Sequence, residues 1–195
     1  NGVVTAVAKG SATITVTTED GNYSATCDVT VTAASTGGAA VKTYKHVFTA
    51  KPSTGNNVTL SGVSWNITAT NLNAYNSNNY AGVQIGTSSK NGQITLTSPS
   101  AWSYTVDDVT VTKIKEVRLW LNLGGTSVTP SVSIGGKAAI SDGTTVTKNS
   151  TAGTDWTKAT KVTFTPAAGG DTGVIVIDVT SVKAGYICAI EIDAE

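Results

Sequence analysis

Apolar and polar residues alternate one by one through many short segments of this chain, and this pattern limits its fold more than any other feature. Every second residue of Glu116–Leu123 is aliphatic, and Ala12–Thr17 and Tyr23–Val31 show the same period. Successive side chains of a β-strand point to opposite faces, so a period of two predicts strands with one buried face. The 34 Thr and 23 Val are β-branched and also favour strands over helices. We therefore predict an all-β protein.

The charge balance excludes two classes of partner. Lys and Arg together number 13, as do Asp and Glu, so the formal net charge is zero. Binding to nucleic acid or to an anionic membrane needs an excess of basic residues, and we expect neither. The longest apolar run is a handful of residues, as in Val174–Ile177, and the first residues show no basic and apolar signal segment. We therefore predict no membrane insertion, and any export signal lies outside these residues.

The first 33 residues read as short strands separated by glycines. We predict strands at Val3–Ala8 and Ala12–Thr17 and a third strand around Cys27. The Asp20-Gly21 pair between two alternating runs predicts a β-hairpin. The segment also contains the pattern G-x-V-T-A-x-x-x-G-x-A-x-I-T from Gly2, followed by C-x-V-x-V at Cys27.

These two patterns resemble the C-terminal half of a bacterial immunoglobulin-like domain of group 2. The resemblance implies that residues 1–33 are the end of such a domain, and that the family's earlier strands precede Asn1 in a longer protein. Members of this family occur in extracellular adhesins and as spacers in surface polysaccharide-degrading enzymes, so the resemblance implies an extracellular or cell-surface bacterial protein. Residues 34–41 are small and featureless, and we predict a linker there.

Residues 42–195 form the predicted second module. Strands at this density, separated by Gly and Asn turns, indicate a β-sandwich or jelly roll. In Asp107–Ile114 the inward phase slips, which either a helical turn or a β-bulge explains. The predicted strands are Tyr44–Ala50, Val58–Thr70, Ala81–Ile85, Gly92–Thr97, Glu116–Leu123, Ser127–Ile134, Lys161–Thr165, Val174–Val179 and Tyr186–Ile192.

Three short motifs of this module carry a second resemblance. The segments Tyr80–Gly86, Leu96–Ser98 and Tyr186–Ile192 resemble β-sandwich modules, similar to carbohydrate-binding ones, in secreted proteins of gut bacteria. This resemblance covers most of residues 42–195 and implies a secreted binding module, without indicating its ligand.

The inventory of catalytic side chains is short, and we predict no enzyme. The single histidine, His46, is in phase with Tyr44 and Phe48, which favours a strand residue packed among aromatics. No nucleophile lies in a G-x-S-x-G turn, and one His with two Cys offers no zinc motif. We predict no cofactor, although sandwich loops can bind structural calcium through Asp and carbonyl oxygens without a linear motif, so the metal stays open.

Carboxylate pairs are the remaining catalytic possibility, because glycoside hydrolysis needs only two such groups. Asp142, Asp155 and Asp171 lie beside Gly or Thr, where Asp commonly forms turns. A catalytic pair would have to face across a cleft at about 5 to 10 Å. The candidates are Asp107, Asp108, Asp142, Asp155, Asp171 and Asp178.

Both cysteines are predicted to be core residues rather than a disulfide. Cys27 alternates with Tyr23 and Val29, and Cys188 lies in phase with Tyr186 and Ile190. Buried thiols behave as small hydrophobes. The two cysteines belong to different predicted modules, which argues against a bond between them.

The aromatic residues suggest where a ligand would bind. The aliphatic face of Glu116–Leu123 places Arg118, Trp120 and Asn122 on the opposite, outer face. An indole stacks on the apolar C–H face of a sugar ring, and the flanking residues can bond its hydroxyl groups. The alternative is that Trp120 is covered by a loop, by the Ig-like half or by a second layer, since Trp is highly buried on average.

The remaining aromatic residues divide between the predicted core and segments whose composition is typical of loops. Trp65 is in phase with Val63 and Ile67 and is expected in the core. Asn71–Tyr80 holds five Asn and two Tyr, a composition typical of adaptable binding loops as well as of disordered polar loops. The predicted additional contacts are Tyr75, Tyr80, Trp102 and Trp156.

The sequence thus favours a non-catalytic extracellular module that binds a polysaccharide or other glycan and is joined to further domains through an Ig-like spacer. The alternative is an adhesion module that binds protein, or a purely structural spacer. Burial of Trp120 and of the loop aromatics would favour the spacer.

Overall fold

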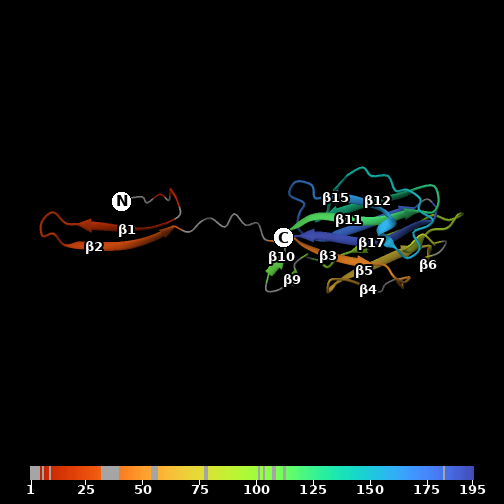
Figure 1. The fold of residues 1–195 in the computed structure, drawn as a ribbon, viewed down its shortest axis with the longest axis horizontal. Helices are drawn as coiled ribbons and strands as arrows, with labels where there is room; N and C mark the ends of the chain where they lie inside the picture. Colours follow the sequence, from red (N-terminus) through yellow and green to blue (C-terminus); the bar gives the residue numbers. More distant parts are fainter. Residues whose placement is uncertain are drawn as a thin grey trace. The chain divides into compact units, whose positions relative to one another are not determined.

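The computed structural model describes most of the chain, in two compact units, Asn1–Gly38 and Ala39–Glu195. The described residues are 5, 7, 8, 10–31, 40–53, 57–76, 79–100, 102, 104–106, 109–111, 113–181 and 183–195. Apart from a short 3-10 turn, η2 (Trp156–Lys158), the regular elements in these ranges are β-strands, paired antiparallel (Figure 1). The predicted all-β class is confirmed.

The first unit is described as a single hairpin of β1 (Gly10–Thr17) and β2 (Ser24–Val31). Its register pairs Ile14 with Cys27 and Thr13 with Asp28, so one face is apolar and the other hydroxyl-rich. Side-chain bonds such as Thr13 Oγ1 to Asp28 Oδ1 (2.6 Å) join the strands on the polar face. The hairpin predicted around Asp20-Gly21 is confirmed.

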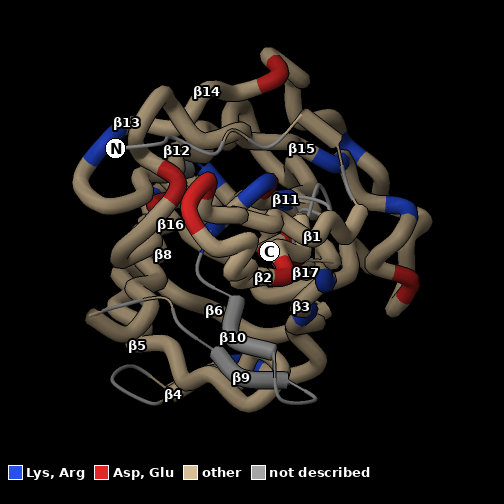
Figure 2. The backbone as a smooth tube through the Cα atoms, turned by 90° about the vertical axis from the view of Figure 1, so that its left-hand side faces the viewer, with Lys and Arg blue, Asp and Glu red and all other residues tan. Residues whose placement is uncertain are grey.

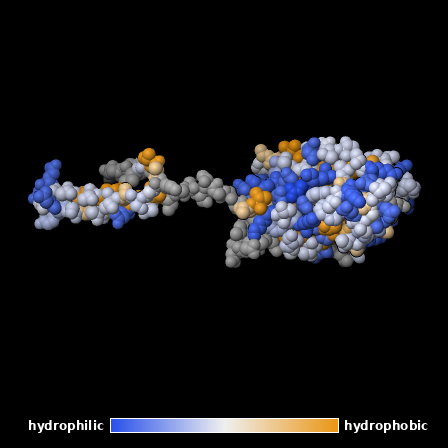
Figure 3. Space-filling model, viewed as in Figure 1, coloured by the Kyte–Doolittle hydropathy of each residue, from blue (hydrophilic) through white to orange (hydrophobic). Residues whose placement is uncertain are grey.

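The apolar face of this hairpin is open to solvent. Val16 is 64% exposed and Cys27 is exposed, and hydrophobic residues are visible at the surface of this unit (Figure 3). The prediction that Cys27 is a core residue is wrong, because the two strands of this hairpin supply only one layer. Most of the predicted strand Val3–Ala8 and the predicted linker 34–41 lie outside the described residues.

The second unit is a sandwich of two antiparallel sheets. The seven-stranded sheet has the order β14-β15-β11-β17-β7-β6. Its seventh strand, β3, lies on the same side of β17 as β7: β7 pairs with the first residues of β17 and β3 pairs with the rest. The six-stranded sheet has the order β13-β12-β16-β8-β5-β4. The strands are β3 (Lys42–Val47), β4 (Asn57–Leu60), β5 (Val63–Thr70), β6 (Leu72–Tyr75), β7 (Val83–Ile85), β8 (Gly92–Thr97), β9 (Tyr104–Val106), β10 (Val109–Val111), β11 (Ile114–Leu123), β12 (Val128–Ile134), β13 (Lys137–Ala138), β14 (Ile140–Ser141), β15 (Thr160–Thr165), β16 (Ile175–Ser181) and β17 (Gly185–Ala194). β9 and β10 form a separate hairpin.

The core lies between the two sheets and contains the aliphatic face of β11, as predicted. Leu119 and Leu121 are fully buried, and Trp65, predicted to be core, is 1% exposed. Charged residues are few and scattered along the backbone (Figure 2).

Two local irregularities change the predicted faces. The register of β11 shifts between Ile114 and Glu116, which is the β-bulge that was one of the two explanations for the phase slip in Asp107–Ile114. The other explanation, a helical turn, does not apply to the described residues Val109–Val111, which form a strand. A second shift, opposite Trp120 and Leu121, makes Cys188 the extra residue of β17. Cys188 therefore lies in phase with Tyr186 but not with Ile190, which faces the core.

Candidate functional site

The outer face of the seven-stranded sheet carries the side chains that the sequence singled out. Trp120 is paired with Lys161 of β15 on one side and with Ala189 of β17 on the other. Arg118 is paired with Glu191, which in turn pairs with Lys45 of β3. Neighbouring strands thus bring these residues into rows across the sheet.

Arg118, the only arginine of the chain, is enclosed by carboxylates. Its Nη1 donates to Asp193 Oδ2 and to Glu116 Oε1 (2.6 Å each), and its Nε donates to Glu191 Oε2 (3.2 Å). A second bond from Nη2 to Asp193 Oδ1 (2.7 Å) makes the Asp193 contact bidentate. The hydrogen bond from Arg118 lowers the pKa of Asp193 below 3.8. Four of the five guanidinium N–H groups are thus used inside the protein, and the Arg118 side chain is only 14% exposed.

Asn122 is fully buried and joins two loops to the sheet. Its Nδ2 donates to the carbonyl oxygens of Tyr80 (2.8 Å) and Asn149 (2.9 Å), and its Oδ1 accepts from the backbone N–H of Asn149 (2.8 Å). All these bonds are to backbone, so the amide fixes the chain around residues 80 and 149. The side chain therefore has no surface to offer a ligand in this structure.

A second apolar cluster covers this part of the sheet on its outer side. We call it the outer cluster; its buried members are Tyr80, Ala81, Ala152, Ala159, Tyr186 and Cys188. Trp120 and Trp156 pack against it and are only partly buried. Burial raises the pKa of the Cys188 thiol to about 12, and its S–H donates to the Ala81 carbonyl oxygen (3.3 Å). Cys188 is thus an inert packing residue, as predicted for a core thiol.

Trp120 and Trp156 form an edge-to-face pair at the solvent border of the outer cluster. Their ring centroids are 5.0 Å apart and their planes are inclined by 83°. Lys45 Nζ lies 4.0 Å from the centroid of the Trp156 ring and 3.5 Å from Glu191 Oε1, so this cation links the pair to the Arg118 network. The two apolar rings thus lie beside the charged groups of Lys45 and Glu191, which the Arg118 network holds in place.

The segment between β14 and β15 positions Trp156 through its own side-chain hydrogen bonds. Asn149 Nδ2 donates to the Lys158 carbonyl oxygen (3.1 Å), while Asn149 Oδ1 accepts from the N–H of Thr151 (3.1 Å). Asp155 begins the 3-10 turn by accepting from the N–H of Thr157 (3.2 Å). Polar turn residues thus build an ordered segment without apolar periodicity.

The other predicted contact residues do not gather around this pair. Trp102 is 3% exposed in the core between the sheets, edge-on to Tyr44 at 5.4 Å, so its expected place on an exposed loop is wrong. Tyr80 is 6% exposed within the outer cluster, and its ring centroid lies 4.8 Å from that of Tyr186 with the two planes inclined by 35°. Tyr75 ends β6 and packs partly buried against the main core.

The candidate acids that the structure describes are bonded to neighbouring groups. Asp142 accepts from the backbone N–H of Thr144 (2.9 Å) and of Thr163 (3.0 Å). Asp178 accepts from Gln93 (2.7 Å) and Thr95 (3.0 Å) on the outer face of the six-stranded sheet. Asp155 caps the 3-10 turn, and the Oδ2 atom of Asp171 lies 3.9 Å from Lys113 Nζ. Asp107 and Asp108 lie outside the described residues.

Within the described ranges, no group of three His, Cys, Asp or Glu side chains is placed to hold a metal ion. Both cysteines are free thiols. No helix in that part of the chain has the length and apolar character needed to cross a membrane. Comparisons with protein-family models, with curated proteins and with solved structures found no match.

Sequence reasoning missed three residues around this site: Lys45, which lies over Trp156, Tyr186 of the outer cluster, and Asn149, which bonds to Asn122. Lys45 was detectable in part, because its alternation with Tyr44 and His46 places it on an outer face. Asn149 lies in a segment without periodicity, so nothing in the sequence indicated its bond to Asn122. Tyr186 reads as core in an unbroken apolar run, and only the bulge turns it outward.

His46 packs against aromatic and backbone groups, as its alternation predicted. Its ring lies edge-on to Phe48 at 4.7 Å, and its Nδ1 is 3.1 Å from the Thr59 carbonyl oxygen of β4. Burial lowers the pKa of His46 below the ordinary 6.5. The unfolded state therefore binds this proton more readily, and stability falls as the pH drops below 6.5.

A pH titration of the His46 ring protons by NMR is expected to give a midpoint below 6.5, with the neutral ring predominating at neutral pH. The unfolded chain in urea supplies the reference midpoint. A folded midpoint at or above the unfolded one would contradict the packing described for this ring.

Proposed function

We propose that residues 42–195 form a non-catalytic, extracellular module that binds a neutral polysaccharide or other glycan through Trp120 and Trp156. The observation that carries the proposal is the partly exposed edge-to-face pair of indoles at the border of the outer cluster. Aromatic rings with one apolar side and one wet side are suited to a sugar, which has C–H faces and hydroxyl edges. The segment 1–33 acts in this proposal as the end of an Ig-like spacer.

Arg118 and Asn122 support the site as positioning residues rather than as contacts. Arg118 holds the strands on one side of Trp120, and Asn122 holds the segment that carries Trp156. The pair is therefore fixed before any ligand arrives, which reduces the ordering cost of binding. The zero net charge of the chain suits an uncharged ligand.

Removal of Trp156 provides the test, because this side chain stands at the border of the cluster. In affinity electrophoresis through gels containing plant or host polysaccharides, we expect at least one neutral polysaccharide to retard the wild type. Trp156→Ala should lose most of that retardation, since an aromatic stacking contact contributes about 1 to 3 kcal/mol to binding. Trp120→Ala is expected to act in the same direction and also to destabilise the outer cluster.

Tyr23→Ala is the matched control, because Tyr23 is 77% exposed on the hairpin unit and far along the chain from the pair. This variant should migrate as the wild type does. Thermal melts separate loss of contact from loss of fold. Equal retardation of wild type and Trp156→Ala, or retardation by no polysaccharide, would reject the site.

A structural spacer or protein-binding adhesion module is the second candidate. The observation that favours it is the burial of Asn122, Tyr80 and Trp102, because three residues expected to reach a ligand are covered by the chain itself. The two candidates separate in the same gel, since a spacer is retarded by no polysaccharide and its migration does not depend on Trp156.

A further inference from the structure

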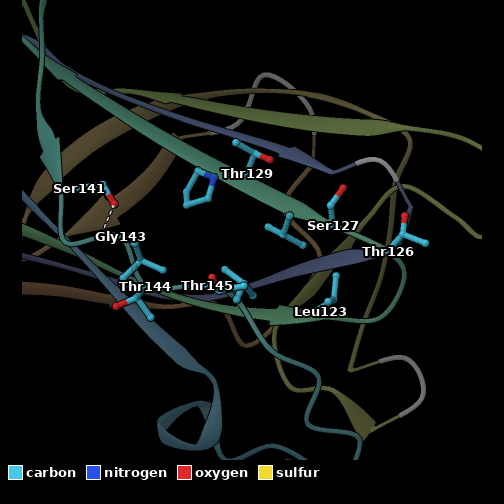
Figure 4. Close-up of a pocket in the computed structure, with 12 residues that line it drawn as sticks. Leu123, Thr126, Ser127, Thr129, Ser141, Gly143, Thr144 and Thr145 are labelled. Carbon is cyan, nitrogen blue, oxygen red and sulfur yellow. Dashed lines mark hydrogen bonds between the residues drawn. The ribbon is translucent and has the colours of Figure 1, made fainter.

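A cleft opens at one edge of the sandwich, where the chain crosses from β11 to β12. Its volume is about 370 Å³, within the range of small-molecule sites. One wall is formed by the start of β12 and the residues before it, and the other by the segment after β14 (Figure 4). The cleft is lined by Leu123, Thr126, Ser127, Val128, Thr129, Pro130, Ser141, Gly143, Thr144, Thr145, Val146 and Val162.

The lining combines hydroxyl groups with an apolar floor. Thr126, Thr129 and Thr145 are exposed, whereas Val146 and Val162 are 5% and 1% exposed. Figure 4 shows Thr126, Ser127 and Thr129 on one side and Ser141, Thr144 and Thr145 on the other. None of the lining side chains is ionisable, so the cleft offers no charge to an ionic ligand.

The outer edge of β12 adds backbone groups to this wall. The Val132 carbonyl oxygen accepts from Ala139 N (2.8 Å), so it points away from β16. Backbone groups of every second residue of an antiparallel strand face the same edge, and those of Pro130 and Val128 therefore face it too. Within the described residues β13 pairs only with Ser133 and Ile134, so the edge is open beside the cleft.

Pro130 decides which ligand suits this edge. It offers a carbonyl oxygen but no N–H, so the edge supplies acceptors at Pro130 and Val128 and a donor only at Val128. An added peptide strand needs alternating donors and acceptors and would lack a partner at Pro130. Sugar hydroxyl groups donate to carbonyls and to threonine oxygens alike, and the C–H face of a sugar matches the valine floor.

We propose that this cleft is a second carbohydrate subsite, which takes one or two residues of an uncharged glycan. It shares no lining residue with the Trp120–Trp156 pair and does not depend on that pair for its chemistry. The hydroxyl groups of Thr126 and Thr145 and the backbone groups at the outer edge of β12 bind the sugar hydroxyls, while Val128 and Val146 contact its ring.

NMR titration of the full chain with neutral gluco-, xylo-, manno- and galacto-configured tetrasaccharides tests the subsite. Saturable shifts are expected for the backbone amides of Thr126, Val128 and Thr145 with at least one sugar. Thr145→Trp should fill the cleft and weaken this response about tenfold or more, which corresponds to about 1.4 kcal/mol. Thr59→Trp, at an exposed position of β4, is the matched control and should leave the response unchanged.

The outcomes distinguish this subsite from the indole pair. Shifts confined to residues around Trp156, and lost in Trp156→Ala, would overturn the subsite and leave the proposed function standing. Shifts at the cleft that persist in Trp156→Ala would support the subsite even if the indole pair binds nothing. Shifts with none of the sugars, or cleft shifts that an extended peptide causes and the sugars do not, would overturn it.

Discussion

Replacement of Asn122 by leucine is expected to lower the free energy of unfolding by about 3 kcal/mol. The change removes three hydrogen bonds and leaves the Tyr80 and Asn149 carbonyls and the Asn149 N–H without their partner in a site that is 0% exposed. Each unsatisfied buried group costs about 1 to 3 kcal/mol. Burial of the apolar leucine side chain returns about 1.5 kcal/mol or more, which limits the net loss.

Urea denaturation gives the stability, and hydrogen exchange shows where it is lost. Faster exchange should concentrate at the Asn149 and Gly153 amides, because Gly153 N–H bonds to the Asn79 carbonyl next to the loop that Asn122 holds. Asn66→Leu is the control, since Asn66 is exposed on β5 and its replacement should change stability by less than about 0.5 kcal/mol. A similar small effect for Asn122→Leu would mean that the amide does not clamp the two loops.

The strands were predictable from the sequence where alternation was unbroken. β8 has the predicted bounds, Gly92–Thr97, and β11 and β12 differ from their predicted bounds by one or two residues. The predicted single strand Val58–Thr70 is two strands joined by a turn at Ser61 and Gly62, whose φ angles are 46° and 87°. The sequence did contain a sign of this turn. Leu60 and Val63 are three residues apart, so the period of two that holds up to Leu60 restarts in the opposite phase at Val63.

The faces of the strands were more predictable than what covers them. Alternation correctly placed Arg118, Trp120 and Asn122 opposite the aliphatic face of β11. Alternation does not report what lies above a face, and here Tyr80 and Ala81, together with Ala152 and Ala159, cover part of it. Hydrogen bonds from Asn and Asp side chains to the backbone fix the conformation of the segment that carries Trp156. Such bonds leave no periodic pattern in the sequence.

The bulge in β17 was not predictable. Tyr186–Ile190 is apolar at every position, so a one-residue shift leaves no mark in the pattern. Its effect is large, because it turns Tyr186 and Cys188 to the outer cluster while Ile187 and Ile190 stay in the core. No sequence pattern indicated that Trp120 of β11 pairs with Trp156 of the 3-10 turn.

Replacement of Arg118 by methionine is expected to destabilise the sandwich by about 2 to 4 kcal/mol near neutral pH. The methionine retains apolar packing but leaves Glu116, Glu191 and Asp193 close together without their shared cation. Lys45 stays near Glu191 at 3.5 Å and relieves part of the repulsion, as does the hydrogen bond from Thr43 to Asp193. The loss should appear as a lower urea midpoint.

The contribution of the Arg118 network to stability should depend on pH with opposite signs in the wild type and in Arg118→Met, whereas the contribution of His46 is common to both. In the wild type the pKa of Asp193 is lowered, so its stabilising contribution is present above 3.8 and is lost as the pH falls through the folded value. In Arg118→Met the three carboxylates stay close together without the guanidinium, so each disfavours the charge of its neighbours. Their repulsion then disappears as they take up protons, so the stability gap between the two proteins should narrow from about pH 7 to about pH 4.

Arg118→Lys separates charge from geometry in this network. Lysine keeps the positive charge but cannot form the bidentate contact with Asp193 while also reaching Glu116 and Glu191, so it should recover only part of the lost stability. Its stability should also fall with acidification, as in the wild type. A gap between wild type and Arg118→Met that stays constant over this pH range would show that the methionine disrupts packing rather than ion pairing. The Arg118 network would then be a consequence of the fold and not one of the interactions that hold β3, β17 and β11 in register beneath Trp120.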